Sequence, residues 1–82
     1  MMKVTLYALT TCPYCRMMKK MLDEGGIEYE LHEVDLLHGE EKKKMVEEVR
    51  RISGGTSFPV VIIGEDVIVG FDKRGIKEKL GL

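Results

Sequence analysis

Two cysteines separated by two residues are the side chains of this chain best suited to chemistry. Cys12 and Cys15 flank Pro13 and Tyr14 at the point where an alternating apolar pattern ends and a helical pattern begins. Proline suits the first helical position because its missing N–H would be unsatisfied there, which places Cys12 at the N-cap and Cys15 at N3. The i, i+3 spacing brings both sulfurs to one helix face, within disulfide reach. The spacing therefore indicates a redox dithiol.

The position of Cys12 also predicts which sulfur attacks. An N-cap side chain accepts a hydrogen bond from the backbone N–H of N2 or N3, and such a bond to the Cys12 sulfur favours the thiolate. The helix dipole alone lowers a thiol pKa of ~8.5 by about one unit or less, so a larger drop requires direct N–H bonds. We predict that Cys12 is the nucleophile and that Cys15, one turn inside the helix, resolves the mixed disulfide.

A zinc site is a competing interpretation of the same cysteines. Structural zinc takes four ligands, and Cys12, Cys15, His32 and His38 together supply four. The gap between the cysteine pair and the histidine pair exceeds the usual window for zinc sites, and His32 lies inside a predicted strand. We therefore predict no metal site, and we expect both histidines to face solvent without a role.

Composition limits the class of protein. The chain has 82 residues, 44% hydrophobic and 33% charged, with a formal net charge of −1. These values predict one small globular domain over residues 1–82, which we expect to be monomeric. The charge favours neither nucleic acid nor an anionic membrane as partner, and no apolar run approaches the ~20 residues of a membrane span. The first residues are too polar for a secretory signal, so the C-x-x-C pair predicts a cytoplasmic redox site.

Periodicity predicts an α/β fold in the order β-α-β-α-β-β-α. The first strand is apolar on both faces and should be central, whereas the second has one polar face and should be an edge strand. Short links around the first helix predict that these two strands are parallel. The sheet should therefore be four-stranded and mixed, with helices on both faces. The predicted elements are strand 3–9, helix 13–24, strand 27–32, helix 39–52, a loop over 53–57, strands 60–63 and 67–69, and helix 73–80 capped by Asp72.

Three segments in this order resemble the glutaredoxin family, over essentially the full length of the chain. They are Cys12-Pro13-Tyr14-Cys15, which matches the dithiol motif, Ser57-Phe58-Pro59, which falls at the cis-proline loop, and Val69-Gly70-Phe71-Asp72, which falls at the glycine-rich turn that holds part of glutathione. The resemblance implies a thioredoxin-like fold and a thiol-disulfide oxidoreductase. It also implies substrate contacts from Pro13, Tyr14, Ser57, Phe58, Pro59, Gly70, Phe71 and Asp72.

The sequence departs from the family at the residues that meet glutathione. Leu9 stands where glutathione-dependent members carry a basic residue, and Val69 and Phe71 alter the usual Gly-Gly turn. The missing cation removes a charge-assisted hydrogen bond worth about 1.5–3 kcal/mol. Gly70-Phe71 is more similar to glutaredoxin-like redoxins that donate electrons to ribonucleotide reductase and are recharged by thioredoxin reductase.

These features predict an electron carrier that reduces protein or mixed disulfides through the Cys12–Cys15 dithiol. We expect no tightly bound cofactor, because the Cys12–Cys15 disulfide is itself the redox-active group. A protein reductase such as thioredoxin reductase would reduce this disulfide again. Ribonucleotide reductase is a candidate substrate. The alternative within the family uses glutathione as co-substrate. An alternative of another class is a redox-sensing module, or one that binds zinc or an iron–sulfur cluster, without turnover; the resemblance links clusters more with variants lacking a proline at position 13.

Overall fold

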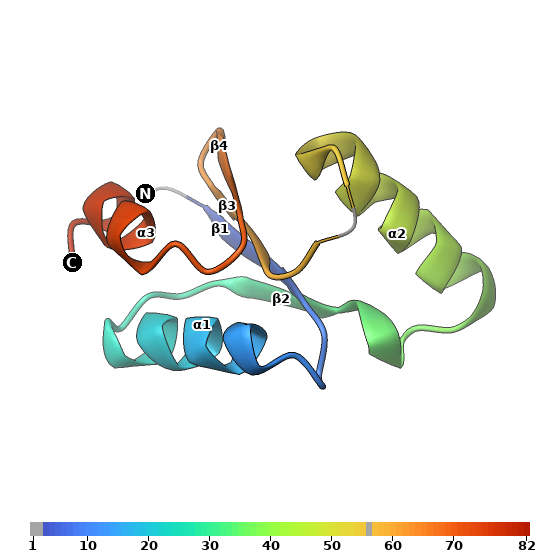
Figure 1. Cartoon of the computed structure of the whole chain (residues 1–82), viewed down its shortest axis with the longest axis horizontal. Helices are drawn as coiled ribbons and strands as arrows, with labels where there is room; N and C mark the ends of the chain where they lie inside the picture. Colours follow the sequence, from blue (N-terminus) through green and yellow to red (C-terminus); the bar gives the residue numbers. More distant parts are fainter. Residues whose placement is uncertain (1–2, 56) are drawn as a thin grey trace.

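Four strands and three helices make up the fold in the computed structural model, which describes residues 3–55 and 57–82 (Figure 1). The predicted order β-α-β-α-β-β-α is confirmed, with one addition, a 3₁₀ turn after the second strand. Thr56 of the predicted loop over 53–57, and residues 1–2 of the predicted domain, lie outside the described residues. The elements are β1 (Val4–Ala8), α1 (Pro13–Glu24), β2 (Glu30–Glu33), η1 (Val34–Leu36), α2 (Gly39–Ser53), β3 (Val60–Ile63), β4 (Asp66–Val69) and α3 (Lys73–Leu80).

The sheet is mixed, with the strand order β2-β1-β3-β4. β1 is parallel to β2 and antiparallel to β3, and β3 forms an antiparallel hairpin with β4. The central place of β1 and the edge place of β2 are as the polarity of their faces predicts. The start of β2 differs from the prediction: it begins at Glu30, because the Ile27 N–H still bonds to the Leu22 carbonyl (2.9 Å) and Gly26, at φ +68°, completes the end of α1.

Two hydrophobic clusters cover the two faces of the sheet. Alternate side chains of β1, such as Leu6, pack with α1 and with Ile76 of α3, whereas Tyr7 points the other way and packs with Val49 of α2. Figure 1 shows α1 and α3 on one side of the strands and α2 on the other. The prediction of helices on both faces is confirmed. Within residues 3–55 and 57–82, no helix combines the length and apolar character needed to cross a bilayer.

The apolar stripe of α1 fixes the orientation of its first turn. Met18 and Leu22 are fully buried beneath the sheet, and Cys15 lies on the same stripe one turn earlier. Burial of each such apolar side chain contributes about 1.5–3 kcal/mol, so rotation of the helix about its axis is strongly opposed. Cys15 is therefore held inside the protein, and Cys12 is held at the rim.

Candidate active site

Cys12 occupies the N-cap of α1 with extended backbone angles (φ −88°, ψ 117°), and Pro13 follows in the first turn. Both cysteines are free thiols, with Cys12 half-buried and Cys15 fully buried. The Cys12 sulfur makes no side-chain hydrogen bond in the geometry of a helix cap.

The surroundings of Cys12 favour its thiolate. Partial burial raises the pKa of this thiol, but the Cys15 thiol and the backbone N–H groups of Cys15 and Tyr14 outweigh it and hold the pKa below its ordinary value. These N–H groups do not meet the geometry of a helix cap. Their partial positive charges nevertheless stabilise the negative charge of the Cys12 thiolate. Cys12 is therefore the more acidic of the two thiols.

Cys15 is shifted in the opposite direction. Burial is the main cause that raises the pKa of Cys15 to about 11, opposed by a hydrogen bond from the Leu9 backbone. The Cys12 sulfur raises the pKa further, because it competes for the shared proton and carries the negative charge, while Lys19 lowers it slightly. At neutral pH the pair therefore consists of a reactive sulfur at the rim and a protonated sulfur beneath it.

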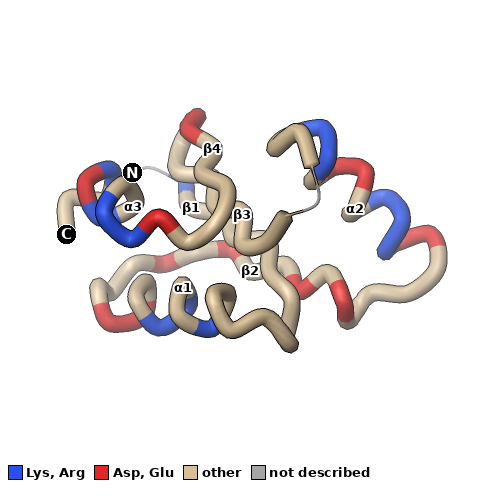
Figure 2. The backbone as a smooth tube through the Cα atoms, viewed as in Figure 1, with Lys and Arg blue, Asp and Glu red and all other residues tan. Residues whose placement is uncertain are grey.

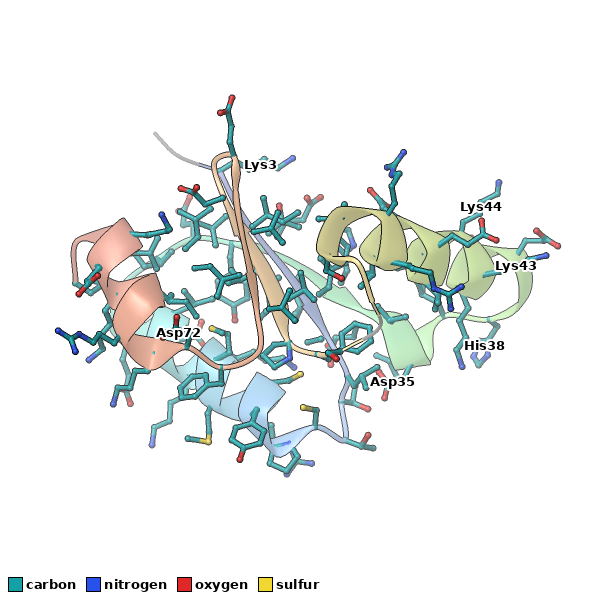
Figure 3. All side chains as sticks on the ribbon, turned by 45° about the horizontal axis from the view of Figure 1, so that its top comes forward. Lys3, Asp35, His38, Lys43, Lys44 and Asp72 are labelled. Atoms are coloured by element: carbon teal, nitrogen blue, oxygen red, sulfur yellow. The ribbon has the colours of Figure 1, made fainter. Side chains whose placement is uncertain are left out.

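The loop between β1 and α1 is anchored by a residue from a distant part of the chain. The Asp35 carboxylate, in η1, accepts hydrogen bonds from the Thr10 N–H (3.0 and 3.1 Å to its two oxygens) and from the Thr10 hydroxyl. Figure 3 shows Asp35 beside this loop. The hydroxyl bond is the main cause that lowers the pKa of Asp35, which keeps the carboxylate ionised. Arg16 donates to the Thr10 carbonyl from the other side (3.4 Å).

The anchored loop contacts both cysteines through Leu9. Its carbonyl accepts a hydrogen bond from the Cys12 N–H (3.3 Å), and its backbone also hydrogen-bonds to the Cys15 sulfur. Sequence reasoning missed Asp35 and Thr10, because an acidic residue after an edge strand matches no cap, metal or catalytic pattern. Their partnership across 25 positions is visible only once β2 lies beside β1.

The proline loop and the glycine-rich turn adjoin one another. The Phe58–Pro59 peptide bond is cis, as the sequence resemblance predicts. Pro59 is buried, and its carbonyl accepts a hydrogen bond from the Gly70 N–H (2.8 Å). Phe58 packs against both hydrophobic clusters, whereas Ser57 is exposed. The second and third predicted segments therefore form one continuous surface at the end of the β3–β4 hairpin.

An aromatic pair joins the glycine-rich turn to the dithiol. Tyr14 and Phe71 stack with their ring centroids 6.4 Å apart and an interplanar angle of 25°, and the Tyr14 side chain is 59% exposed. Phe71 and Cys12 pack against the same cluster that contains Cys15. The carboxylate of Asp72 is committed elsewhere, because it accepts the Gly75 N–H (3.1 Å) and caps α3. Each of the three predicted segments thus contributes one side chain, Cys12, Phe58 or Phe71, that packs against this cluster.

Comparison with known proteins agrees with this geometry. A glutaredoxin family model matches residues 4–68. The chain belongs to the glutaredoxin family. A glutaredoxin 1 of Rickettsia prowazekii is 36% identical over 83 residues, covering 94% of this chain and 84% of that protein. The structure of a glutaredoxin from Archaeoglobus fulgidus superposes with a TM-score of 0.91 at 39% identity, covering 98% and 87% of the two chains. Methanoredoxin of Methanosarcina acetivorans superposes with a TM-score of 0.90 at 40% identity, covering 98% and 85%.

This glutaredoxin is a thiol-disulfide oxidoreductase with a thioredoxin-like fold.

The two histidines of the zinc interpretation lie in different surroundings. His32 stacks on Tyr7 with ring centroids 5.2 Å apart, on the face of the sheet that α2 covers, so it is half-buried and does not simply face solvent as expected. His38 is exposed at the start of α2 (Figure 3). Within the described residues, no three His, Cys, Asp or Glu side chains come together as a metal site.

Proposed function

We propose that this glutaredoxin carries two electrons to disulfides, with Cys12 as the attacking sulfur and Cys15 as the resolving sulfur. The observation that carries the proposal is the opposite shift of the two pKa values across one turn of α1. The Cys12 thiolate attacks one sulfur of a substrate disulfide, forms a mixed disulfide with it and expels the other sulfur as a thiolate, which takes up a proton. Half of the substrate then remains attached to the rim of the site.

The second step closes the dithiol. Cys15 loses its proton and attacks the Cys12 sulfur, which releases the second substrate thiolate and leaves a Cys12–Cys15 disulfide. Once the Cys12 sulfur is part of a disulfide it carries no charge, so it no longer opposes ionisation of Cys15. The Leu9 backbone supplies a hydrogen bond to the thiolate that forms there. Two electrons have then moved from this chain to the substrate, whose two thiolates take up one proton that Cys15 released and one from water.

The reductant that restores the dithiol is a protein reductase, in this proposal of the thioredoxin reductase type. Leu9 brings no cation to the site, and the exposed Tyr14, stacked on the half-buried Phe71, offers an apolar surface of the kind that a protein partner covers. A glutaredoxin-like protein of Clostridium pasteurianum, 33% identical over 73 residues, is named for its place in a rubredoxin operon, which associates a relative with electron-transfer proteins. The proposed carrier is monomeric and cytoplasmic, and ribonucleotide reductase is a candidate substrate.

Glutathione is the second candidate reductant. A buckwheat glutaredoxin, 26% identical with a TM-score of 0.75, is known as a complex with glutathione. Glutaredoxins also have reduction potentials of about −200 to −230 mV, which a glutathione pool can reach. In this candidate mechanism glutathione would bind beside Cys12, without a basic partner at Leu9.

Reduction of the oxidised protein distinguishes the two reductants. The Cys12–Cys15 disulfide would be mixed either with glutathione and glutathione reductase or with thioredoxin reductase, each with NADPH, and then coupled to 2-hydroxyethyl disulfide. We expect faster turnover with thioredoxin reductase. Efficient turnover with glutathione, and none with the protein reductase, would reverse the assignment. A disulfide that either system reduces once, without turnover of the small disulfide, would indicate a sensor instead of a carrier.

A further inference from the structure

A groove beside the aromatic pair extends the active-site surface between α1 and α3. It has a volume of about 310 Å³, and its apolar lining comes from Met17 and Met21 of α1 and from Phe71. Met17 is 49% exposed, an unusual degree for a long apolar side chain on a helix whose other methionines are buried. Because Phe71 also stacks on Tyr14, between the two cysteines, the groove is continuous with the dithiol surface.

Lysines dominate the polar rim of this groove. Lys20 comes from α1, and Lys73 and Lys77 come from α3. The one carboxylate of the lining, Glu24, is paired with Lys20 (3.9 Å). Among the ion pairs found within residues 3–55 and 57–82, none uses Lys73 or Lys77. Two positive charges therefore face the groove without an ion-pair partner among the described residues.

The charge of α3 differs from that of the chain as a whole. The chain as a whole has a net charge of −1, yet α3 carries four basic residues and one acidic residue. Figure 2 shows basic residues gathered on α3 and in the middle of α1, and acidic residues along β2 and η1. A local positive field on a slightly acidic protein attracts acidic partners to one face and raises their association rate.

We propose that this groove docks an acidic segment, bearing an apolar side chain, of the protein whose disulfide is reduced. The inference rests on the proposed function, since it names the partner of that same site. The apolar side chain would lie on Met17 and Phe71, and the carboxylates would face Lys73 and Lys77. This arrangement holds the partner's disulfide against Cys12, at a distance set by the Tyr14–Phe71 pair. Charge selects the partner, and the apolar contact retains it.

Peptide mixed disulfides test the proposal directly. Two peptides of equal length would each carry one Phe and one Cys, with the Cys sulfur activated as a neutral 2-thiopyridyl disulfide; one would have Asp and Glu flanks and the other Lys flanks. Attack by Cys12 on the peptide sulfur releases 2-thiopyridone, which stopped-flow absorbance follows. We expect the reduced protein to react about tenfold faster with the acidic peptide at low salt, and the preference to fall below about twofold near 1 M salt.

Two charge-reversed variants locate the preference. Lys73→Glu combined with Lys77→Glu should abolish or invert it. Lys43→Glu combined with Lys44→Glu makes the same change of net charge on α2, far from α3 (Figure 3), and should leave most of the preference in place. Equal losses in the two variants, or no preference in the unmodified protein, would overturn the proposal. All proteins should react alike with neutral 2-hydroxyethyl disulfide; failure of that reaction in the unmodified protein would overturn the proposed function, and the docking proposal with it.

Discussion

The N-termini of α1 and α3 face the same requirement, and only α3 meets it with a side-chain hydrogen bond. In α3 the Asp72 carboxylate accepts the Gly75 N–H (3.1 Å), which satisfies one of the backbone donors that every helix start leaves unpaired. In α1 the corresponding residue is Cys12, whose sulfur makes no capping hydrogen bond. An oxygen cap is worth about 0.5–2 kcal/mol, so α1 forgoes stability that α3 has.

The difference shows what the open N-terminus of α1 provides. Its N–H groups, from Tyr14 and Cys15, lower the pKa of the Cys12 thiol without being consumed by a permanent cap. A carboxylate that capped α1 would occupy the Tyr14 and Cys15 N–H groups with permanent hydrogen bonds. These N–H groups would then not be available to stabilise a thiolate. Stability at one helix and reactivity at the other thus draw on the same backbone groups. Changes at the two N-termini should separate these effects.

The largest effect is expected from Cys12→Ser. The serine oxygen keeps the shape of the N-cap and is a better cap than sulfur, so the free energy of unfolding should stay constant or rise by up to about 1 kcal/mol. Disulfide reduction should fall by at least about 1,000-fold, because a serine hydroxyl does not ionise to a thiolate near neutral pH. Turnover of 2-hydroxyethyl disulfide and urea unfolding measure the two quantities. Activity within tenfold of the unmodified protein would contradict the role given to Cys12.

The next effect concerns the pH dependence of alkylation at the two cysteines. A pKa of about 11 leaves roughly one Cys15 thiol in ten thousand ionised at pH 7, whereas the lowered pKa of Cys12 leaves a far larger fraction. Limiting iodoacetamide should therefore modify Cys12 at least about 100 times faster, as read by peptide mass spectrometry. As pH is raised, the Cys12 alkylation rate should level off at a pH below the pKa of an ordinary thiol. The Cys15 alkylation rate should still rise near pH 11. Equal rates at neutral pH would remove the basis for the assignment.

The same shifts have opposite consequences for stability. Cys12, with a lowered folded-state pKa, contributes stability above the pKa of the unfolded thiol, and this contribution is lost as pH falls through its folded-state pKa. Cys15, with a raised folded-state pKa, contributes stability below the unfolded value, and this is lost as pH rises toward about 11. In an alkaline titration of stability the two cysteines therefore partly offset one another.

Much of the fold follows from local sequence patterns. The alternation in residues 3–9, the stripe containing Met18 and Leu22, and the cap at Asp72 each reflect forces that act within a few residues, and each predicted element is present. The dithiol is equally local, because the spacing of Cys12 and Cys15 is itself the signal. The late start of β2 was harder to predict, since Ile27 matches a strand pattern while its N–H remains bonded to the end of α1.

The unpredicted parts of the site depend on contacts between distant segments. The clamp of Asp35 on Thr10 requires β1 and β2 to lie side by side, and the stack of Tyr14 on Phe71 requires the β3–β4 hairpin to end beside α1. The lack of a capping hydrogen bond at the Cys12 sulfur also depends on exact atomic positions. The sequence predicted the two cysteines as the candidate reactive residues, but not the contacts that hold them in place.

A smaller effect should follow from Asp35→Ala, which breaks the clamp on the loop before α1. Thr10 would lose three acceptor contacts, and the neighbouring Leu9 backbone would hold the Cys15 sulfur less firmly. Resolution of the mixed disulfide should then slow about threefold to tenfold, because less thiolate forms at Cys15. Stopped-flow release of the second substrate thiol measures this step.

Two controls separate this positioning role from general destabilisation. Asp66→Ala removes an exposed carboxylate that pairs with Lys79 in another part of the fold, and it should leave the resolving step unchanged. Asp35→Asn keeps an acceptor for Thr10 and should restore part of the rate. A slower resolving step in both alanine variants, or an Asp35→Ala effect confined to thermal stability, would argue against the positioning role.

The smallest net effect is expected from a substitution at Gly75, the residue whose N–H donates to the capping carboxylate of Asp72. Asp72→Ala alone should cost about 1 kcal/mol and lower Tm by about 4–8 °C, with no change in the alkylation of Cys12. Gly75 lies in the first turn of α3, where a Cβ would come within 2.5 Å of the Asp72 Oδ2 atom. Glycine is normally worse than alanine in a helix by about 0.5–1 kcal/mol, so its presence here accommodates the cap.

The two residues should therefore be coupled in a double-mutant cycle. In the Asp72→Ala background, Gly75→Ala should stabilise the protein by about 0.5–1 kcal/mol, since no carboxylate remains in its way. In the unmodified background the gain in helix propensity should be cancelled by displacement of the cap, so the net change should be close to zero. Urea unfolding of the four proteins gives a coupling energy, expected at about 1 kcal/mol. Additive effects would mean that the Asp72 carboxylate moves aside at no cost, and that the cap contributes less to α3 than its geometry indicates.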